Sequence, residues 1–253
     1  MPRSRSRSSA NRIRQLARAL LTALIGAAAL LTGSGSPAAA ARAGSGVAST
    51  QLLAVLLTPH NVRSELGNPT TRVDTIRAYR PITDQATVLP VVGSATTANG
   101  VRWLRVMLPG RPNGRRGWIE QRGTKPAETS WHVVVHTASR RVFVYRLGRL
   151  VMSFSAVVGK PSTPTPKGSF FVEESVRMPA GSPGAPFALA LSARSDVLRQ
   201  FEGGSGQIAI HGVLNLGGTP GTAVSHGCVR LPTGALRWLV MHVSAGAPVT
   251  ITS

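Results

Sequence analysis

Apolar and polar residues alternate in short runs over most of the chain after residue 70, and this pattern predicts a mainly β protein. Glycine, proline and asparagine separate the runs, as is typical of short strands joined by tight turns. The expected strands are residues 72–79, 87–92, 101–108, 117–119, 131–135, 141–146, 150–158, 169–176, 207–211 and 248–251. Because no long helical pattern comes between them, a doubly wound α/β sheet is excluded.

Two short helices are expected in the last third of the chain. The apolar residues from Leu236 to Val243 are spaced i, i+3, i+4 and i+7, which gives one apolar face to a helix that Thr233 would cap. Ser195 can cap a second helix over residues 196–201. The prediction is therefore a β domain that carries one or two short helices.

The patterns divide the chain into two β regions. Residues 71–124 hold short strands with a turn about every ten residues, which favours a small β-barrel. In this region the strand around Trp103, a glycine-rich turn and the tripeptide 117–119 resemble bacterial SH3-like domains. That resemblance implies a module that binds or positions cell-wall peptide, and a structural spacer is the alternative. Residues 42–70 are expected to be a linker, and residues 130–252 a second, larger β domain.

The first 41 residues have the layout of an export signal. They contain six arginines and no acid, an apolar run from Leu16 to Leu31, and small residues up to Ala41. This order is typical of a cleavable secretory signal peptide, which we assign to residues 1–41. An uncleaved membrane anchor is the alternative, but the uninterrupted apolar run is shorter than the ~20 residues that span a bilayer. We therefore expect a secreted protein that contacts the membrane only before cleavage.

The sequence is strongly basic, with 29 Lys and Arg residues against 9 Asp and Glu residues. Removal of residues 1–41 would leave 23 basic and 9 acidic residues, a net charge of +14. So basic a surface favours an anionic polymer as partner. Because export would separate the protein from most nucleic acid, we expect acidic cell-wall polymer or a membrane face as the partner of this surface rather than DNA or RNA. The base composition of the genome is an alternative explanation of the many arginines.

Candidate chemistry is concentrated around Cys228, the only cysteine in the chain. A single cysteine in an exported protein forms an intermolecular bridge or is a reactive thiol. His226 lies two residues before it and His211 seventeen residues before it. The thiolate is the nucleophilic form, and an imidazole within reach is its usual base. In an extended strand His226 and Cys228 would share one face, and the backbone N–H groups of Gly227 and Cys228 would be available to an oxyanion.

A zinc site is the competing functional interpretation, because one cysteine and two histidines could supply three ligands. No carboxylate lies near them in the sequence to complete the set, so we expect no metal. A buried thiol with two incidental histidines is the structural alternative. The glycine-rich loop 217–221 favours catalysis, since it could fold back and bring His211 beside Cys228.

Two separated stretches resemble the L,D-transpeptidase family with its YkuD-type catalytic domain. One is Ile210-His211-Gly212, followed by the heptapeptide SHGCVRL at residues 225–231. The other lies upstream, from Val158 to Phe170, and contains the sequence TPTPKGSF. The resemblance covers about residues 130–252. It implies a catalytic domain of the β-sandwich type that needs neither a metal nor an organic cofactor.

The resemblance also implies a role for each matching residue. Cys228 would be the nucleophile, His211 the proton acceptor and donor, and His226 a support for the thiolate. The N–H groups around Gly227 and Cys228 would hold the oxyanion.

Three further residues of the motifs would shape the site. Ser225 would fix the loop through hydrogen bonds, and Gly212 would belong to the substrate pocket. Arg230 would orient the site or meet a substrate carboxylate, with a structural ion pair as the alternative.

These roles imply an exported acyltransferase that acts in peptidoglycan synthesis at the cell wall. The thiolate would attack a tetrapeptide stem and release D-alanine, and an amine of a neighbouring stem would resolve the thioester into a cross-link. Carbapenems would acylate the same cysteine. An L,D-carboxypeptidase, in which water replaces the amine, and a non-catalytic wall-binding protein are the alternatives.

Overall fold

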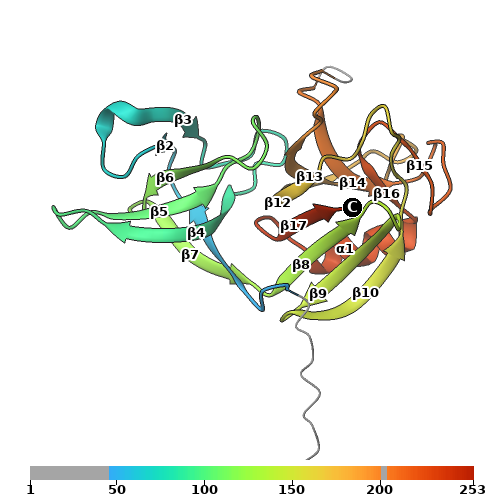
Figure 1. Cartoon of the computed structure of the whole chain (residues 1–253), viewed down its shortest axis with the longest axis horizontal. Coiled ribbons are helices and arrows are strands. Elements are labelled where there is room, and N and C mark those ends of the chain that lie inside the picture. The colour runs from blue at the N-terminus through green and yellow to red at the C-terminus, as the bar shows by residue number, and fades with distance from the viewer. Residues whose placement is uncertain (1–45, 201–203) are drawn as a thin grey trace, which may run out of the picture. The chain divides into compact units, whose positions relative to one another are not determined.

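The computed structural model describes residues 46–200 and 204–253 (Figure 1). The expected signal peptide at residues 1–41 lies outside this range. The described chain is mainly β, as predicted, and its strands form one seven-stranded, one eight-stranded and one two-stranded sheet. Across these residues no helix has both the length and the apolar character needed to span a membrane.

The first sheet is entirely antiparallel and curls into a nearly closed barrel. Its strand order is β3-β2-β6-β5-β4-β1-β7, and a 3-10 turn at Pro69–Thr71 precedes β3. The strands are β1 (Gln51–Leu56), β2 (His60–Arg63), β3 (Arg72–Ile76), β4 (Val88–Thr96), β5 (Arg102–Met107), β6 (Arg116–Glu120) and β7 (Thr124–Thr129). Alternate residues of β5 and β6, such as Val106 and Ile119, are fully buried in its core.

The structure differs from the expected linker at residues 42–70. Strands β1 and β2 lie inside this range, and β1 pairs with both β4 and β7. Leu53 and Leu56 of β1 are buried, so their apolar character reflects a strand of the sheet. The sheet also continues beyond residue 124 into β7. This strand is a polar edge strand that contains Pro126, and it therefore lacks the apolar alternation of a central strand.

The second sheet has eight strands in the order β10-β9-β8-β17-β12-β13-β14-β16. Its neighbours are antiparallel except for the pairs β17–β8 and β14–β16. The strands are β8 (Trp131–His136), β9 (Arg141–Arg146), β10 (Arg149–Ser155), β12 (Gly168–Arg177), β13 (Phe187–Arg194), β14 (Gln207–Gly212), β16 (Val229–Leu231) and β17 (Pro248–Thr252). Two short parallel strands, β11 (Val158–Gly159) and β15 (Ala223–Ser225), form the third sheet.

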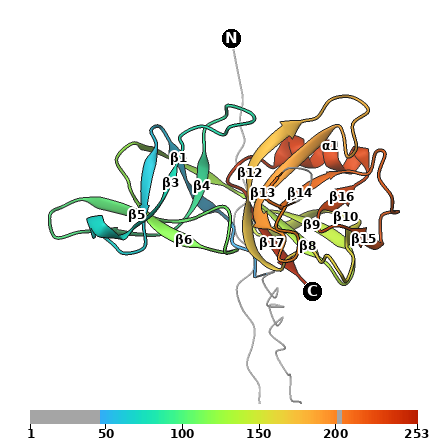
Figure 2. The ribbon, with the colours of Figure 1, turned by 90° about the horizontal axis from the view of Figure 1, so that it is seen from above.

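One α-helix, α1 (Thr233–His242), packs against β13 and β14 (Figure 2). Leu236 and Leu239 on its apolar face are fully buried in the core of the second sheet, as the spacing predicted. Its N-cap is Pro232, and no side chain caps the helix, so the expectation of a Thr233 cap is wrong.

The second expected helix does not form over the described residues 196–200. Ser195 Oγ does accept hydrogen bonds from the N–H groups of Val197 and Leu198, as a cap would. However, the carbonyl oxygens of Ser195 and Leu198 accept hydrogen bonds from the Arg111 guanidinium. A contact with a distant arginine therefore takes carbonyl groups that a helix would use.

Candidate functional site

A cavity of about 900 Å³ brings the predicted reactive side chains together. Cys228, His211, His226 and Arg230 all line it. Its other lining residues carry no charge and include Met178 and Pro183 of the β12–β13 loop. The motif around His211 and the motif around Cys228, which are separated in the sequence, thus line one cavity, as catalysis by a thiol and an imidazole requires.

Parallel pairing of β14 with β16 sets the position of the two motifs. Ile210 pairs with Val229 and His211 pairs with Arg230. Cys228 comes directly before β16, and His211 is the next-to-last residue of β14. Because His211 lies opposite Arg230, which is two residues after Cys228, the backbone register brings the histidine and the cysteine close together on neighbouring segments, in addition to any freedom of the glycine-rich loop.

His226, Gly227 and Cys228 form a turn, so the expectation that His226 and Cys228 share a strand face is wrong. Strand β15 ends at Ser225 and β16 begins at Val229. Gly227 has φ +119°, and a Cβ at this position would lie 3.0 Å from Cδ1 of Ile208. A glycine is required here because the turn uses a backbone conformation that other residues rarely adopt.

Ser225 organises this turn from a fully buried position. Its hydroxyl donates to the carbonyl of Cys228 at 2.6 Å and accepts from the N–H of Gly227 at 3.1 Å. The Gly227 N–H, expected as an oxyanion donor, is therefore engaged by Ser225 in this conformation.

The upstream motif supports the same turn, which sequence reasoning did not foresee. The carbonyl of Ser225 accepts from the Thr163 hydroxyl at 3.1 Å and from the Lys160 N–H at 3.0 Å. Thr165 in turn accepts from the N–H of Gly159 at 2.9 Å. The buried threonines of the TPTP sequence thus hold the segment that carries Cys228, and their burial is not visible in the sequence.

His211 is held in one tautomer by the backbone. Its Nδ1 lies 2.9 Å from the carbonyl oxygen of Gly212, which can only accept, so Nδ1 carries the proton and Nε2 is the basic atom. The pKa of His211 is lowered to about 4, chiefly by burial; the bond to Gly212 opposes this shift, and the positive charge of Arg230 adds to it. The imidazole is therefore neutral at neutral pH and can accept a proton.

Two glycines pack behind this imidazole. Gly212 is buried and does not line the cavity, and a Cβ on it would lie 2.2 Å from the carbonyl oxygen of Ala185. Gly184 has φ +83°, and a Cβ there would lie 2.5 Å from Nδ1 of His211. Gly212 therefore acts through its carbonyl and its small size, and Gly184 is a supporting residue that the motifs did not reveal.

The thiol of Cys228 is half-buried and faces a carbonyl group. Its Sγ lies 4.0 Å from the carbonyl oxygen of Gln207, the first residue of β14. A carbonyl acceptor stabilises the protonated thiol rather than the thiolate. His211 is neutral at rest, and the thiol of Cys228 is directed toward the carbonyl of Gln207.

Arg230 brings a buried positive charge to the cavity. It is 9% exposed, its Nη1 donates to the carbonyl of Gly217, and its Nε has no hydrogen-bond partner. Among the described residues it makes no ion pair with a carboxylate, so the structural ion pair considered above is absent there. Likewise, within residues 46–200 and 204–253 no three His, Cys, Asp or Glu side chains are grouped as a metal site would need.

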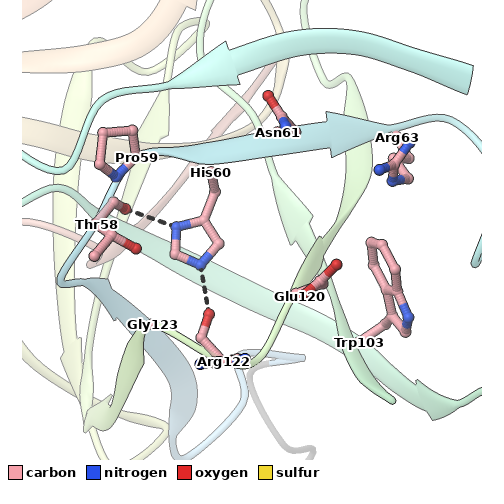
Figure 3. Close-up of a pocket in the computed structure, with 9 residues that line it drawn as sticks. All are labelled: Thr58, Pro59, His60, Asn61, Arg63, Trp103, Glu120, Arg122 and Gly123. Atoms are coloured by element: carbon pink, nitrogen blue, oxygen red, sulfur yellow. Dashed lines mark hydrogen bonds between the residues drawn. The ribbon is translucent and has the colours of Figure 1, made fainter. Parts of the chain in front are cut away.

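A second cavity, of about 350 Å³, lies in the first sheet (Figure 3). His60, Arg63, Trp103, Glu120 and Arg122 contribute to its wall. His60 is buried, and its two ring nitrogens lie 2.7 Å and 3.0 Å from the carbonyl oxygens of Thr58 and Arg122. Both nitrogens are thus engaged by the backbone, and this histidine is a structural part of the wall.

Comparison with known proteins places residues 130–251, which contain this cavity, in a family. The family described as the L,D-transpeptidase catalytic domain matches residues 130–251. YkuD of Bacillus licheniformis, to which an L,D-transpeptidase activity is ascribed, is 33% identical over 130 residues, which are 50% of this chain and 68% of that protein. YkuD of Bacillus subtilis is 29% identical over 146 residues, 58% of this chain and 73% of that protein. The chain belongs to the L,D-transpeptidase family.

Solved structures of this family are also similar. L,D-transpeptidase 3 of Mycobacterium tuberculosis, in complex with a faropenem-derived adduct, shows 18% identity and a TM-score of 0.42, over 66% of this chain and 91% of that one. An L,D-transpeptidase of Mycobacterium smegmatis shows 17% identity and a TM-score of 0.38, over 78% of this chain and all of that one.

Proposed function

We propose that this protein is an exported peptidoglycan L,D-transpeptidase in which Cys228 is the acyl carrier. Membership of the L,D-transpeptidase family supports a transpeptidase role in the cell wall. The observation that carries the residue assignment is the single cavity lined by Cys228, His211, His226 and Arg230.

The reaction begins when a tetrapeptide stem enters the cavity. His211 Nε2 takes the thiol proton, and Sγ of Cys228 attacks the carbonyl carbon that precedes the terminal D-alanine. The tetrahedral intermediate collapses, His211 returns the proton to the leaving amine, and D-alanine departs. The amine of a neighbouring stem then attacks the thioester, and the new amide forms the cross-link while Sγ regains a proton.

The neutral resting state of His211 suits this sequence. An imidazole that already carried a second proton could not act as a base, and the lowered pKa of His211 keeps Nε2 unprotonated over the ordinary pH range. The Nδ1 bond to Gly212 keeps the ring in the orientation that this step needs. His226 lies in the same cavity and would support the thiolate.

Arg230 supplies recognition of a substrate carboxylate. A buried guanidinium without a carboxylate partner among the described residues is a costly arrangement that a bound anion would relieve. Stem peptides carry carboxylates next to the bond that is broken. The Gly227 N–H could donate to the oxyanion only after its hydrogen bond to Ser225 Oγ is broken. Its use as an oxyanion donor therefore requires a small adjustment of the turn.

Export, cleavage after residue 41 and location at the cell wall complete the proposal, together with an SH3-like identity for the first sheet. The basic composition of the chain suits an anionic wall polymer. A carbapenem, whose strained carbonyl would meet the same thiol, is expected to acylate Cys228.

The test is incubation of the protein lacking residues 1–41 with purified tetrapeptide stems. Cross-linked dimers and one D-alanine released for each acylation are expected, and Cys228→Ala should form neither. Tripeptide as the only product would replace the proposal with L,D-carboxypeptidase activity. Equal products from Cys228→Ala would remove the cysteine from the mechanism.

A further inference from the structure

One network of buried charges has no part in the proposed reaction. It joins Arg80, in the turn between β3 and β4 of the first sheet, to β12 and β13 of the second. Arg80 bonds directly to Glu173 and lies 3.6 Å from Glu174, and both carboxylates are 2% exposed. Arg194 Nη1 donates to Oε1 of Glu173 at 3.0 Å. Two cations therefore balance two buried anions where the two sheets meet.

Gln207 connects this network to the active-site cavity. Its side-chain amide donates to Oε1 of Glu173 at 3.1 Å and to the carbonyl of Leu191 at 3.0 Å. The same residue lines the cavity, and its own carbonyl oxygen is the atom that faces Sγ of Cys228 at 4.0 Å. A continuous series of contacts thus runs from Arg80 through Glu173 and Gln207 to the thiol.

Side chains of the first sheet also bond to described residues at the end of β13 and just before β14. Asn113 of the β5–β6 loop donates to the carbonyl of Arg194 and accepts from its N–H, both at 2.8 Å. Arg111 of the same loop donates to the carbonyl oxygens of Ser195, Leu198 and Ser205. The first sheet is therefore bonded both to Arg194, the last residue of β13, and to Ser205, two residues before β14.

Stability alone is a weak explanation for the charged network. Burying an ion pair costs so much hydration that apolar side chains of similar volume often stabilise a protein as well or better. The ion pair does fix the orientation of the Glu173 carboxylate. One carboxylate oxygen accepts from Arg80, and the other accepts from the side-chain amide of Gln207. This orientation of Glu173 would have a role beyond stability if the position of Gln207 affects the active site.

We propose that Arg80 is a positioning residue for the Cys228 thiol and acts through Glu173 and Gln207. This inference rests on the proposed function, because it takes Cys228 to be the nucleophile. The Gln207 carbonyl stabilises the protonated thiol, so its placement controls how readily the proton passes to His211. The titratable and charged groups that share the cavity with the thiol are His211, His226 and Arg230, and a substitution of Arg80 leaves all three in place.

The experiment compares variants of the protein lacking residues 1–41. Arg80→Ala is expected to lower kcat about ten- to a hundredfold while KM for the stem changes by less than about twofold, because geometry at the thiol is lost and substrate contacts are kept. Alkylation of Cys228, the only thiol, is read against pH, and the profile should move to lower pH as the carbonyl contact loosens. Arg80→Lys keeps the charge and should recover part of kcat.

Arg63→Ala is the matched control. Arg63 lies in the same sheet, but its guanidinium donates to the carbonyl groups of Asn68 and Pro69, and among the described residues it forms no ion pair with Glu173 or Glu174. It should keep the wild-type kcat and alkylation profile. If Arg80→Ala folds poorly, Arg80→Ala with Glu174→Gln keeps the charges balanced and should show the same loss.

Three results would overturn the inference. The first is a wild-type kcat and alkylation profile in the Arg80 variants, and the second is an equal loss of kcat in Arg63→Ala. The third is a loss of kcat on adding Arg80→Ala to Gln207→Ala that is as large as the loss on adding Arg80→Ala to the wild type. The two proposals fail separately. Absence of cross-linking by the wild-type protein would reject the proposed function, whereas the alkylation profile needs no turnover and tests the role of Arg80 directly.

Discussion

Replacing His211 by glutamine should flatten the dependence of stability on pH. In the folded protein the pKa of His211 is about 4, whereas an unfolded histidine titrates near 6.5. The unfolded chain therefore binds more protons between these values. A depressed histidine contributes stability that is present above pH 6.5 and is lost as pH falls toward 4.

The size of the effect follows from the two pKa values. Between pH 7 and pH 5 the linkage relation gives a loss of about 2 kcal/mol from this single group. Because the imidazole is not wholly removed from solvent, we expect about 1–2 kcal/mol. Burial also lowers the pKa of His132, which adds a loss of the same sign that both proteins share.

Urea denaturation of the wild type and of His211→Gln at pH 7 and pH 5 measures this difference. The wild type should lose about 1–2 kcal/mol more than the variant over that interval. Glutamine is similar in size and does not titrate, so other groups cancel in the comparison. Equal losses in the two proteins would show that the pKa of His211 is close to that of an unfolded histidine, and the argument for a neutral resting base would then fail.

Three further substitutions test other parts of the site and fold. Arg230→Met removes a charge that lowers the pKa of His211, so the acidic limb of the kcat/KM profile should move to higher pH, and KM for the stem should rise about tenfold or more. Gly184→Ala should lower kcat by displacing His211, whereas Gly181→Ala, at a similar φ of +78° with open space around it, should cost stability alone. His60→Leu removes the ring N–H that one of the two neighbouring carbonyl groups accepts, and thermal or urea unfolding should show a loss of about 1–3 kcal/mol with kcat unchanged.

The sequence was sufficient where local pattern decides structure. Alternating apolar residues predicted most strands of the second sheet, and the spacing of Leu236 and Leu239 predicted α1. The pattern was misleading where a partner distant in sequence decides the outcome. Strand β7 is a polar edge strand recognisable only from its pairing with β1, and Arg111 takes the carbonyl groups that a helix after Ser195 would need.

The candidate site shows the same division. The motifs around His211 and Cys228 pointed to two residues that share one cavity, because a unique thiol and spaced histidines are visible in a sequence. The turn at Gly227 and the engagement of its N–H by Ser225 depend on a backbone conformation that spacing does not encode. No sequence motif marks Gln207, because its contact with the thiol is made by a backbone carbonyl, a group that every residue has.

The most direct test of the central claim is the mass of the protein during turnover. The protein lacking residues 1–41 is mixed with a tetrapeptide stem whose acceptor amine is chemically blocked, quenched in acid and digested for mass spectrometry. The account predicts a peptide in which Cys228 carries the stem without its terminal D-alanine, as a thioester that hydroxylamine removes. Product formation without any acylated Cys228, or an adduct on another residue, would contradict it.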